Sequence, residues 1–507
     1  MDEASAWVQP QKGNAVPLFL WMLLGWPLAL PALGQVLAPR PDAARLGLAA
    51  DKIWQESAAR PLAYEVLKDA TQAIGHRMSG TANGAKAEEY ILLKAKALGL
   101  KPIRYQKFPI QVWQRQYLEL DIVPQQSDHF VRYEAVALAH SPREADVRAR
   151  LVDAGNGLRE DFERIKDSVP GRMVLLNIGL EGAKPGRKNL HRSEKAALAQ
   201  EFGAAGIVFI NAAPGRTLLT GTASVDGNLI AIPALCIGND AGRALRKWLG
   251  EERLLAQVRM ENSFEEREAR NVIASLRGKT KPNEVIVVGA HWDSWDLASG
   301  ATDNGLGSAA ILEAARLLKA TGLEPDRTIQ FVWFMGEEQG LVGSSHYVAQ
   351  AKKRKELGRV KYMLNFDMAG NAKGWNTFGH GQAAEYFSTI GRLAQVRDTG
   401  YTNLIESRPG LHSDHQPFLL EGIPVADPIA NMPAAVYNCY HADCDHIKIL
   451  EPEYLERTAR LAALLAYALA TEPILPATRL SDEATKQMLI KAGLKEKLVL
   501  GKDWRWD

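Results

Sequence analysis

Short apolar runs alternate with amphipathic segments in the second half of the chain. Residues 285–289, 328–335 and 360–366 are apolar and rich in β-branched or aromatic side chains, as buried parallel strands usually are. Between the first two runs, residues 308–318 carry apolar side chains at helical spacing. We therefore predict an α/β fold with a mostly parallel, twisted sheet that has helices on both faces.

Upstream of this pattern, the sequence predicts helices first and strands afterwards. Residues 51–74 and 85–98 are predicted to form two helices, and Gly99 follows the second as a C-terminal cap. Residues 103–113 and 118–123 are predicted to form two strands.

The middle third of the chain changes character. Short β-like runs separated by Gly and Pro extend over residues 134–258, and one clear helix is predicted among them, at residues 193–203. The pattern indicates a small β-rich insert with its own sheet, carried on the main domain.

The N-terminus carries a candidate export signal. Residues 15–33 are apolar throughout, Lys12 precedes them, and Ala32 and Gly34 have the spacing that a signal peptidase accepts. We predict a cleaved signal peptide over residues 1–34 and a secreted or periplasmic protein. The alternative is a retained membrane anchor, because the run is nearly long enough to span a bilayer.

Composition narrows the classes of partner. The 507 residues are too many for one ordinary hydrophobic core, so two or three domains are expected. The 61 basic and 59 acidic residues leave a formal charge of +2, which gives no electrostatic footprint for nucleic acid. Among the cysteines, Cys439 and Cys444 are close enough to pair in an oxidising compartment, but with Cys236 they could equally be small buried residues.

Polar residues that can bind metal follow the apolar runs predicted to be strands. Because ligands of such sheets bind outside the carboxyl ends of the strands, these side chains are expected to meet. The candidate metal ligands are His291, Asp303, Glu338, Asp367 and His441, in the motifs GAHWDS, GATDNGLG, FMGEEQGLVGS, NFDMAG and YHADCD.

These residue types suit a catalytic metal site. Imidazole nitrogens with carboxylate oxygens suit zinc, and cobalt or manganese can substitute. Asp303 lies in a glycine-rich loop and has two oxygens, so it can bridge two cations. Of the adjacent Glu337 and Glu338, one can bind metal while the other moves a proton. Asp293 can orient His291 and raise its basicity.

The five motifs, in this order and spacing, resemble the dinuclear-zinc exopeptidase family of leucyl aminopeptidases and glutamate carboxypeptidases. The early helices and the insert resemble its plasma glutamate carboxypeptidase (carboxypeptidase Q) branch, and the insert is similar to a protease-associated domain. The predicted organisation is then a signal peptide (1–34), the N-terminal part of the peptidase domain (35–130), the protease-associated insert (131–258), the zinc peptidase catalytic domain (259–475) and a C-terminal extension (476–507).

The resemblance implies a role for each candidate ligand. Asp303 would bridge two zinc ions. His291 and Asp367 would complete one site, and Glu338 and His441 would complete the other. The peptide bond that follows Asp303 would be cis.

The resemblance also implies the remaining catalytic and substrate-binding groups. Glu337 would be the general base, and Asp293 would orient a ligand. Ser413, Asp414 and His415 resemble an element that lines the family's substrate pocket. The chain departs from the family at His446, where threonine is usual, and in having no tyrosine just ahead of Ser413. The candidate oxyanion donors in place of that tyrosine are His412 and Tyr440.

The function implied is a zinc-dependent exopeptidase acting on dipeptides or short peptides, with the recognised end of the substrate left open. Asp414 is a candidate partner for a free amine, and Arg77, Arg408 or the basic loop 184–195 for a carboxylate. The alternatives are a glutaminyl cyclase-like acyltransferase with one zinc and a non-catalytic receptor-like module, and the complete ligand set argues against both. A homodimer is implied by the resemblance alone, and no stable membrane association is expected after signal cleavage.

Overall fold

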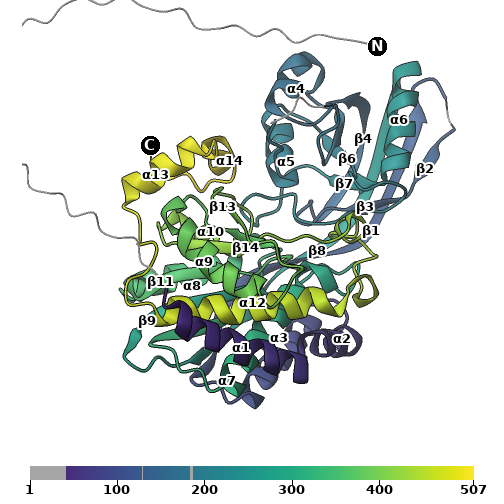
Figure 1. Ribbon diagram of the computed structural model, residues 1–507. Helices are drawn as coiled ribbons and strands as arrows, with labels where there is room; N and C mark the ends of the chain where they lie inside the picture. Colours follow the sequence, from purple (N-terminus) through teal and green to yellow (C-terminus); the bar gives the residue numbers. More distant parts are fainter. Residues whose placement is uncertain (1–40, 128, 183–186, 507) are drawn as a thin grey trace, which may run out of the picture. The chain divides into compact units, whose positions relative to one another are not determined.

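The computed structural model describes residues 41–127, 129–182 and 187–506. These residues form one compact unit, drawn in Figure 1. The predicted signal peptide over residues 1–34 lies outside the described residues. None of the helices within the described ranges is long and apolar enough to cross a bilayer.

The described residues contain a 14-stranded sheet and helices that pack against it. The strands are β1 (Ile103–Pro124), β2 (Val131–Tyr133), β3 (Ala135–Ala137), β4 (Glu144–Asp153), β5 (Met173–Asn177), β6 (Gly206–Ile210), β7 (Ala234–Ile237), β8 (Leu254–Leu276), β9 (Lys281–His291), β10 (Arg327–Phe334), β11 (Val360–Asn365), β12 (Gly374–Asn376), β13 (Leu404–Glu406) and β14 (Val425–Pro428). The helices are α1 (Ala43–Ala59), α2 (Ala63–Ala73), α3 (Ala82–Ala97), α4 (Arg159–Arg164), α5 (Arg192–Glu201), α6 (Asn239–Glu251), α7 (Leu306–Ala320), α8 (Val342–Lys353), α9 (Ala384–Gln395), α10 (Gln416–Leu420), α11 (Ala434–Tyr437), α12 (Pro452–Thr471), α13 (Asp482–Lys491) and α14 (Lys495–Leu500).

The centre of the sheet confirms the predicted α/β fold. Strands β11, β9 and β10 are neighbours and run parallel, and β14 continues the sheet parallel to β11. The carboxyl ends of β9, β10 and β11 therefore meet at one edge. On the other side of β10 the sheet continues with β8, which runs antiparallel, so the complete sheet is mixed.

Helices cover both faces of these central strands, as predicted. Alternate residues of a strand point to opposite faces. Ile286 and Val288 of β9 are buried in the same cluster as residues of α1, α2, α7, α9 and α12. Val285 and Val287 are buried on the other face with residues of α8, α10, α13 and α14. Figure 1 shows α12 and α1 side by side across the first of these faces.

A long antiparallel ribbon of β1 and β8 joins the insert to the central sheet. One end of β8 pairs with β10, and its other end pairs with β4 of the insert. The two strands predicted at residues 103–113 and 118–123 are therefore one strand, with a register shift between Arg115 and Tyr117. The prediction was wrong there because the side chains from Gln114 to Tyr117 are largely exposed, so the apolar pattern lapses between the two domains.

The insert has its own core, as predicted, but its strands belong to the same 14-stranded sheet, which continues from β8 into β4. Strands β4, β5, β6 and β7 are parallel neighbours, and β3 is antiparallel to β7. The helix predicted at residues 193–203 is α5. Helices α4 and α6 were not predicted. In α6 only Gly242 and Leu245 are fully buried.

One helix of the prediction is divided in two. Residues 51–74 belong to α1, which ends at Ala59, and α2, which begins at Ala63. Pro61 lacks the N–H that would continue the helix, and it disfavours helical geometry at Arg60. The next helix, α3, begins at Ala82 rather than at residue 85. Gly99 follows α3 with a φ of 71°, which confirms the predicted cap.

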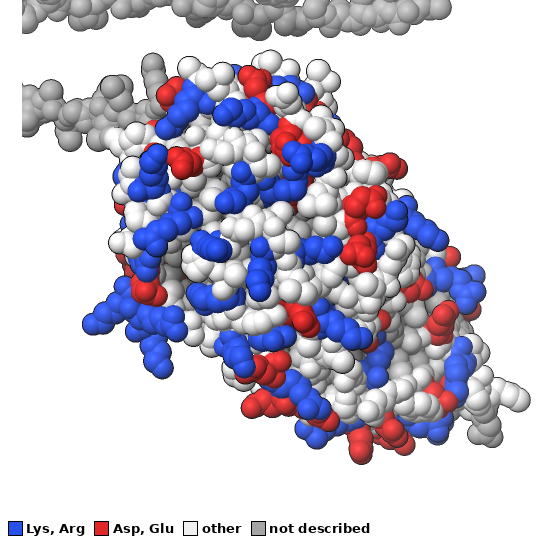
Figure 2. All heavy atoms as spheres, turned by 90° about the horizontal axis from the view of Figure 1, so that it is seen from below, with Lys and Arg blue, Asp and Glu red and all other residues white. Residues whose placement is uncertain are grey.

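Basic and acidic side chains are interspersed on the face shown in Figure 2. Over the whole sequence, the 61 basic and 59 acidic residues nearly balance. Exposed ion pairs such as Arg392 with Glu385, at 2.9 Å, typically contribute less than about 1 kcal/mol each. Apolar burial on the two faces of the sheet is therefore the larger source of stability.

Candidate active site

The five candidate metal ligands come together at the carboxyl ends of the central strands. His291 is the last residue of β9, Glu338 follows β10, and Asp367 follows β11. Asp303 lies in the turn that opens α7, and His441 lies in the loop after α11. The side chains of four of these residues are at most 6% exposed, and that of Asp367 is 22% exposed.

Asp303 lies between the two histidines. Its Oδ1 is 3.2 Å from His291 Nε2, and its Oδ2 is 2.9 Å from His441 Nε2. Asp367 Oδ1 lies 3.3 Å from the same nitrogen of His291, and Glu338 Oε2 lies 2.9 Å from that of His441. The set thus divides into two groups, each with one histidine and one carboxylate of its own, and Asp303 is shared.

Glu337 and Asp293 adjoin the His291 side of this set. The Nδ1 of His291 lies 3.2 Å from the carbonyl oxygen of Asp293, so Nε2 is the nitrogen that faces the other carboxylates. The Glu337 backbone N–H donates to Asp293 Oδ1 at 3.4 Å. Glu337 Oε2 is 3.9 Å from His291 Nε2. Asp293 therefore contacts both the histidine and the segment that carries Glu337.

Added positive charge would stabilise the buried carboxylates of the site. Burial raises the pKa of Glu338 to about 7 and that of Glu337 well above its usual value. Burial also tends to raise the pKa of Asp303, but hydrogen bonds with His291 and His441 lower this pKa overall. Oxygens of Glu338 and Asp293 are buried without a hydrogen-bond partner. Carboxylates crowded in this way are stable in the charged form when cations lie among them.

The turn that carries Asp303 is held by side chains from distant segments. The carboxylate of Asp445 accepts hydrogen bonds from the backbone N–H groups of Thr302 at 2.7 Å and Asp303 at 3.1 Å. The amide of Asn304 donates to the carbonyl of Phe366 at 2.8 Å. The peptide bond between Asp303 and Asn304 is cis, as the resemblance implies.

The segment of Ser413, Asp414 and His415 lies beside Asp367. Ser413 Oγ donates to Asp367 Oδ2 at 2.7 Å and accepts from Asn365 Nδ2 at 2.8 Å. His415 lines the cavity into which the candidate ligands open, as do His412 and Tyr440. Asp414 is completely buried and is not part of the cavity lining, and burial raises its pKa to about 7. A substrate in the cavity would therefore not contact Asp414 directly.

Arg77, a candidate partner for a substrate carboxylate, lies in the protein interior and does not line the cavity. It is completely buried, and its guanidinium donates to the carbonyls of Trp292, Ser299 and Gly300. Burial lowers its pKa to about 10, against the attraction of carboxylates that include Asp445. Arg77 therefore fixes the backbone between β9 and the Asp303 turn. Arg408, with a side chain 78% exposed and paired with Glu406, does not line the cavity.

The loop that carries His441 is held in three ways. Cys439 and Cys444 form a disulfide, so this pairing is confirmed and Cys236 is the buried free thiol. His441 Nδ1 lies 3.3 Å from the carbonyl of Thr220, a residue of the insert, which leaves Nε2 facing Asp303. The Tyr440 ring stacks on that of His441 with centroids 3.8 Å apart.

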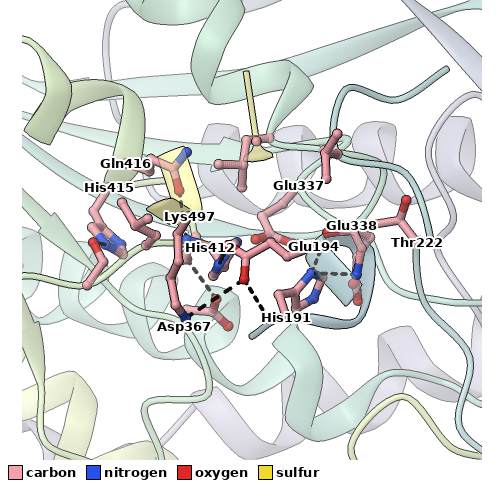
Figure 3. A pocket seen from close by; sticks show the side chains of 18 of the residues that line it. His191, Glu194, Thr222, Glu337, Glu338, Asp367, His412, His415, Gln416 and Lys497 are labelled. Carbon is pink, nitrogen blue, oxygen red and sulfur yellow. Dashed lines mark hydrogen bonds and ion pairs between the residues drawn. The ribbon is translucent and has the colours of Figure 1, made fainter. Parts of the chain in front are cut away.

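The candidate ligands open into a cavity of about 450 Å³. Its walls come from three parts of the chain: the central strand ends, the insert and the C-terminal segment. Figure 3 shows Glu194 of the insert and Lys497 of α14 lining the same cavity as Glu337, Glu338 and Asp367. The basic run 184–195 was a sequence signal for the insert residues, but nothing in the local pattern marked Lys497.

The comparison with known proteins agrees with this geometry. Residues 271–466 match Peptidase family M28, and residues 144–245 match the PA domain. The chain thus carries an M28 peptidase domain in residues 271–466. It is therefore a hydrolase that carries a PA domain, and both parts of the predicted resemblance are confirmed.

Relatives of this peptidase include enzymes named for opposite ends of a peptide. Aminopeptidase YwaD of Bacillus subtilis is 29% identical over 85% of this chain and 88% of its own length. Carboxypeptidase Q of Bos taurus is 24% identical over 82% of this chain and 86% of its own length.

Two solved structures extend the comparison to the fold. A peptidase M28 precursor from Shewanella amazonensis superposes with a TM-score of 0.73 at 22% identity, over 87% of this chain and all (100%) of that one. A zinc aminopeptidase from Bacillus subtilis gives 0.61 at 28% identity, over 83% of this chain and 97% of that one.

Replacing Arg77 with methionine should loosen the backbone that leads to Asp303. The substitution leaves the buried carbonyls of Trp292 and Ser299 without a donor, and each such loss costs about 1–3 kcal/mol. The Gly300 carbonyl keeps the hydrogen bond from the Gly305 N–H at 3.0 Å. We expect the free energy of unfolding to fall by at least about 2 kcal/mol, measured by denaturant titration. The matched control is Arg408→Met, at an exposed position, which should leave it unchanged. Equal stability of the two variants would contradict this role.

Removing the disulfide should weaken metal binding through His441. We expect the double variant Cys439→Ser/Cys444→Ser to retain divalent metal about 10- to 100-fold less tightly, as happens when groups that orient metal ligands are lost. Dialysis against a graded series of chelator concentrations measures this retention. Cys236→Ser, at a buried thiol outside the site, is the control. Identical retention in the double variant and the unmodified protein would show that the disulfide does not position His441.

Proposed function

We propose that the protein is a zinc-dependent exopeptidase that hydrolyses dipeptides or short peptides with two zinc ions per chain. The observation that carries the proposal is the position of Asp303 between two histidines, each of which has a second carboxylate within 3.3 Å. The zinc aminopeptidase from Bacillus subtilis, which shares the fold, supports the choice of metal.

The residues present fit two zinc ions. His291, Asp303 and Asp367 offer nitrogen and oxygen atoms on one side, and His441, Asp303 and Glu338 offer them on the other. Mixed ligation of this kind, with room for water, is typical of catalytic zinc, and cobalt or manganese can substitute. The buried, unpartnered oxygen of Glu338 is also explained by a cation beside it.

Glu337 has the position required of the general base. Bound zinc would lower the pKa of water and polarise the scissile carbonyl. Glu337 lines the cavity and lies 3.9 Å from His291, and it is not needed to complete either group of ligands. It would accept the proton of the attacking water and pass it to the leaving amine. Asp293 would act by holding His291 and the Glu337 backbone in place.

Tyr440 is the better placed of the two candidate oxyanion donors. It lines the cavity next to His441, and burial raises the pKa of its hydroxyl, which therefore stays protonated and can donate. His412 also lines the cavity, but its Nε2 lies 3.2 Å from Glu194 Oε1. That contact occupies one of the two ring nitrogens of His412.

The variant Glu337→Gln tests this assignment. We expect two zinc ions per chain to be retained and the hydrolysis rate to fall by about 10²–10⁴, the usual contribution of general-base catalysis. Elemental analysis gives the zinc content, and dipeptide cleavage gives the rate. Glu385→Gln, at a position outside the cavity, is the control. Full activity of Glu337→Gln would overturn the assignment. One zinc would favour the cyclase-like alternative, and none would favour the non-catalytic module.

Arg192 favours a substrate with a free carboxylate. It lines the cavity, is 5% exposed, and its Nε has no hydrogen-bond partner. The described contact of its guanidinium is with the Tyr440 hydroxyl, at 3.5 Å. A side chain at Gly221 would overlap the guanidinium, so the glycine makes room for it. A buried cation without an anionic partner is costly, and a substrate carboxylate would supply that partner.

The variant Arg192→Met tests which end of the substrate is recognised. We expect the unmodified enzyme to cleave a free dipeptide about 10- to 100-fold faster, in kcat/KM, than its C-terminal amide, as charged hydrogen bonds of about 1.5–3 kcal/mol predict. Arg192→Met should lose this preference, mainly through a higher KM for the free dipeptide. Arg216→Met, an exposed arginine of the insert, should keep it. Equal cleavage of acid and amide by the unmodified enzyme would instead favour recognition of the amine.

The disulfide also supports the predicted compartment. Disulfides persist in oxidising surroundings, and Cys439–Cys444 lies within the described residues. We therefore propose a secreted or periplasmic enzyme. The cleaved signal peptide and the homodimer stay predictions.

A further inference from the structure

A second cavity lies next to the active-site cavity. It has a volume of about 330 Å³, compared with about 450 Å³ for the first. Its lining combines the insert, through Leu158, Arg159 and Lys188, with the C-terminal segment, through Gly493 and Glu496. Lys497 lines both cavities, so its side chain lies at the boundary between them.

Lys497 is held at this boundary by Glu194. Its Nζ is 3.9 Å from Glu194 Oε2, and its side chain is 18% exposed. Glu194 is itself fixed, because its Oε2 accepts a hydrogen bond from the His191 backbone N–H at 2.7 Å and its Oε1 lies 3.2 Å from His412 Nε2. Figure 3 shows these four side chains in the middle of the view, between His415 and Glu338.

The segment around Lys497 is attached to both sides of the cavity. Leu498 is 1% exposed and packs in the cluster that contains Phe418. Asp503 accepts a hydrogen bond from Gln416 at 2.7 Å, and Lys502 pairs with Asp226 of the insert at 2.5 Å. The wall that Lys497 forms is therefore a built part of the fold. It lies outside residues 144–245 and 271–466, the parts that match the two families.

We propose that Lys497 is a specificity-determining residue that limits the length of the peptide substrate by separating the two cavities. This inference rests on the proposed function. An extended peptide lengthens by about 3.3–3.6 Å per residue, so each residue added toward α14 brings the substrate closer to the Lys497 side chain. The cavity behind it is also lined by Glu160 and Glu496, and its Arg159 is paired with Glu201 at 2.7 Å. Lys188 carries a charge that would suit the carboxylate of a longer peptide once the partition is removed.

The experiment compares peptides of two to six residues on three variants of the full-length enzyme. Lys497→Ala removes both the bulk and the charge, Lys497→Met keeps most of the bulk, and Lys491→Ala is a control on the exposed side of α13. We expect kcat/KM of the unmodified enzyme to fall at least about tenfold between tripeptide and pentapeptide. Lys497→Ala should raise the pentapeptide-to-dipeptide ratio of kcat/KM at least about tenfold. Lys497→Met and Lys491→Ala should keep the original ratio.

Three outcomes would overturn the partition. They are equal cleavage of dipeptides and pentapeptides by the unmodified enzyme, an unchanged ratio in Lys497→Ala, and a Lys497→Met variant that behaves like Lys497→Ala. Binding of the same peptides, measured by calorimetry, gives a readout that does not require hydrolysis. If no peptide is cleaved but binding still ends at a length that Lys497→Ala extends, the proposed function fails and the partition stands.

Discussion

One carboxylate has to face two histidines at once, and the arrangement of the site follows from this requirement. The two oxygens of Asp303 lie 3.2 Å from His291 and 2.9 Å from His441. A strand end places His291, but Asp303 depends on a turn whose backbone is held by Asp445 and by the residues that Arg77 contacts. These supports are buried and come from distant parts of the chain. The repulsion among the carboxylates is therefore opposed by the folding of the whole domain, before any cation is bound.

The insert contributes directly to the geometry of the candidate ligands. The carbonyl of Thr220 faces His441 Nδ1, and the His441 carbonyl accepts a hydrogen bond from the Thr220 N–H at 3.0 Å. The orientation of one histidine thus depends on a domain that supplies no candidate ligand of its own. A displacement of the insert would alter the His441 ring as well as the cavity wall, so substrate access and ligand geometry are physically linked through this loop.

The sequence predicted the structure correctly where the position of a residue follows from the local pattern. Apolar runs predicted β9, β10 and β11, and the polar residues that follow them were correctly expected to meet. Two errors have local causes: Pro61 divides a predicted helix, and the largely exposed residues from Gln114 to Tyr117 hid the continuity of β1. The other errors arise where long-range contacts decide. Arg77 was a candidate partner for a substrate carboxylate, but its partners are carbonyls more than two hundred positions later in the chain. No local signal could indicate that Lys497 would reach the cavity.

The residues that the sequence predicted and those that it did not predict belong to different parts of the site. The candidate ligands and Glu337 lie within residues 271–466, the part that matches the M28 family, and their spacing is fixed by parallel strand ends. Arg192 and Lys497 approach the same cavity from the insert and from the C-terminal segment. Neither lies within hydrogen-bond distance of a candidate ligand in the described contacts. The wall residues Arg192 and Lys497 are therefore distinct from the candidate ligands, and the insert affects the ligand geometry through the contact of Thr220 with His441.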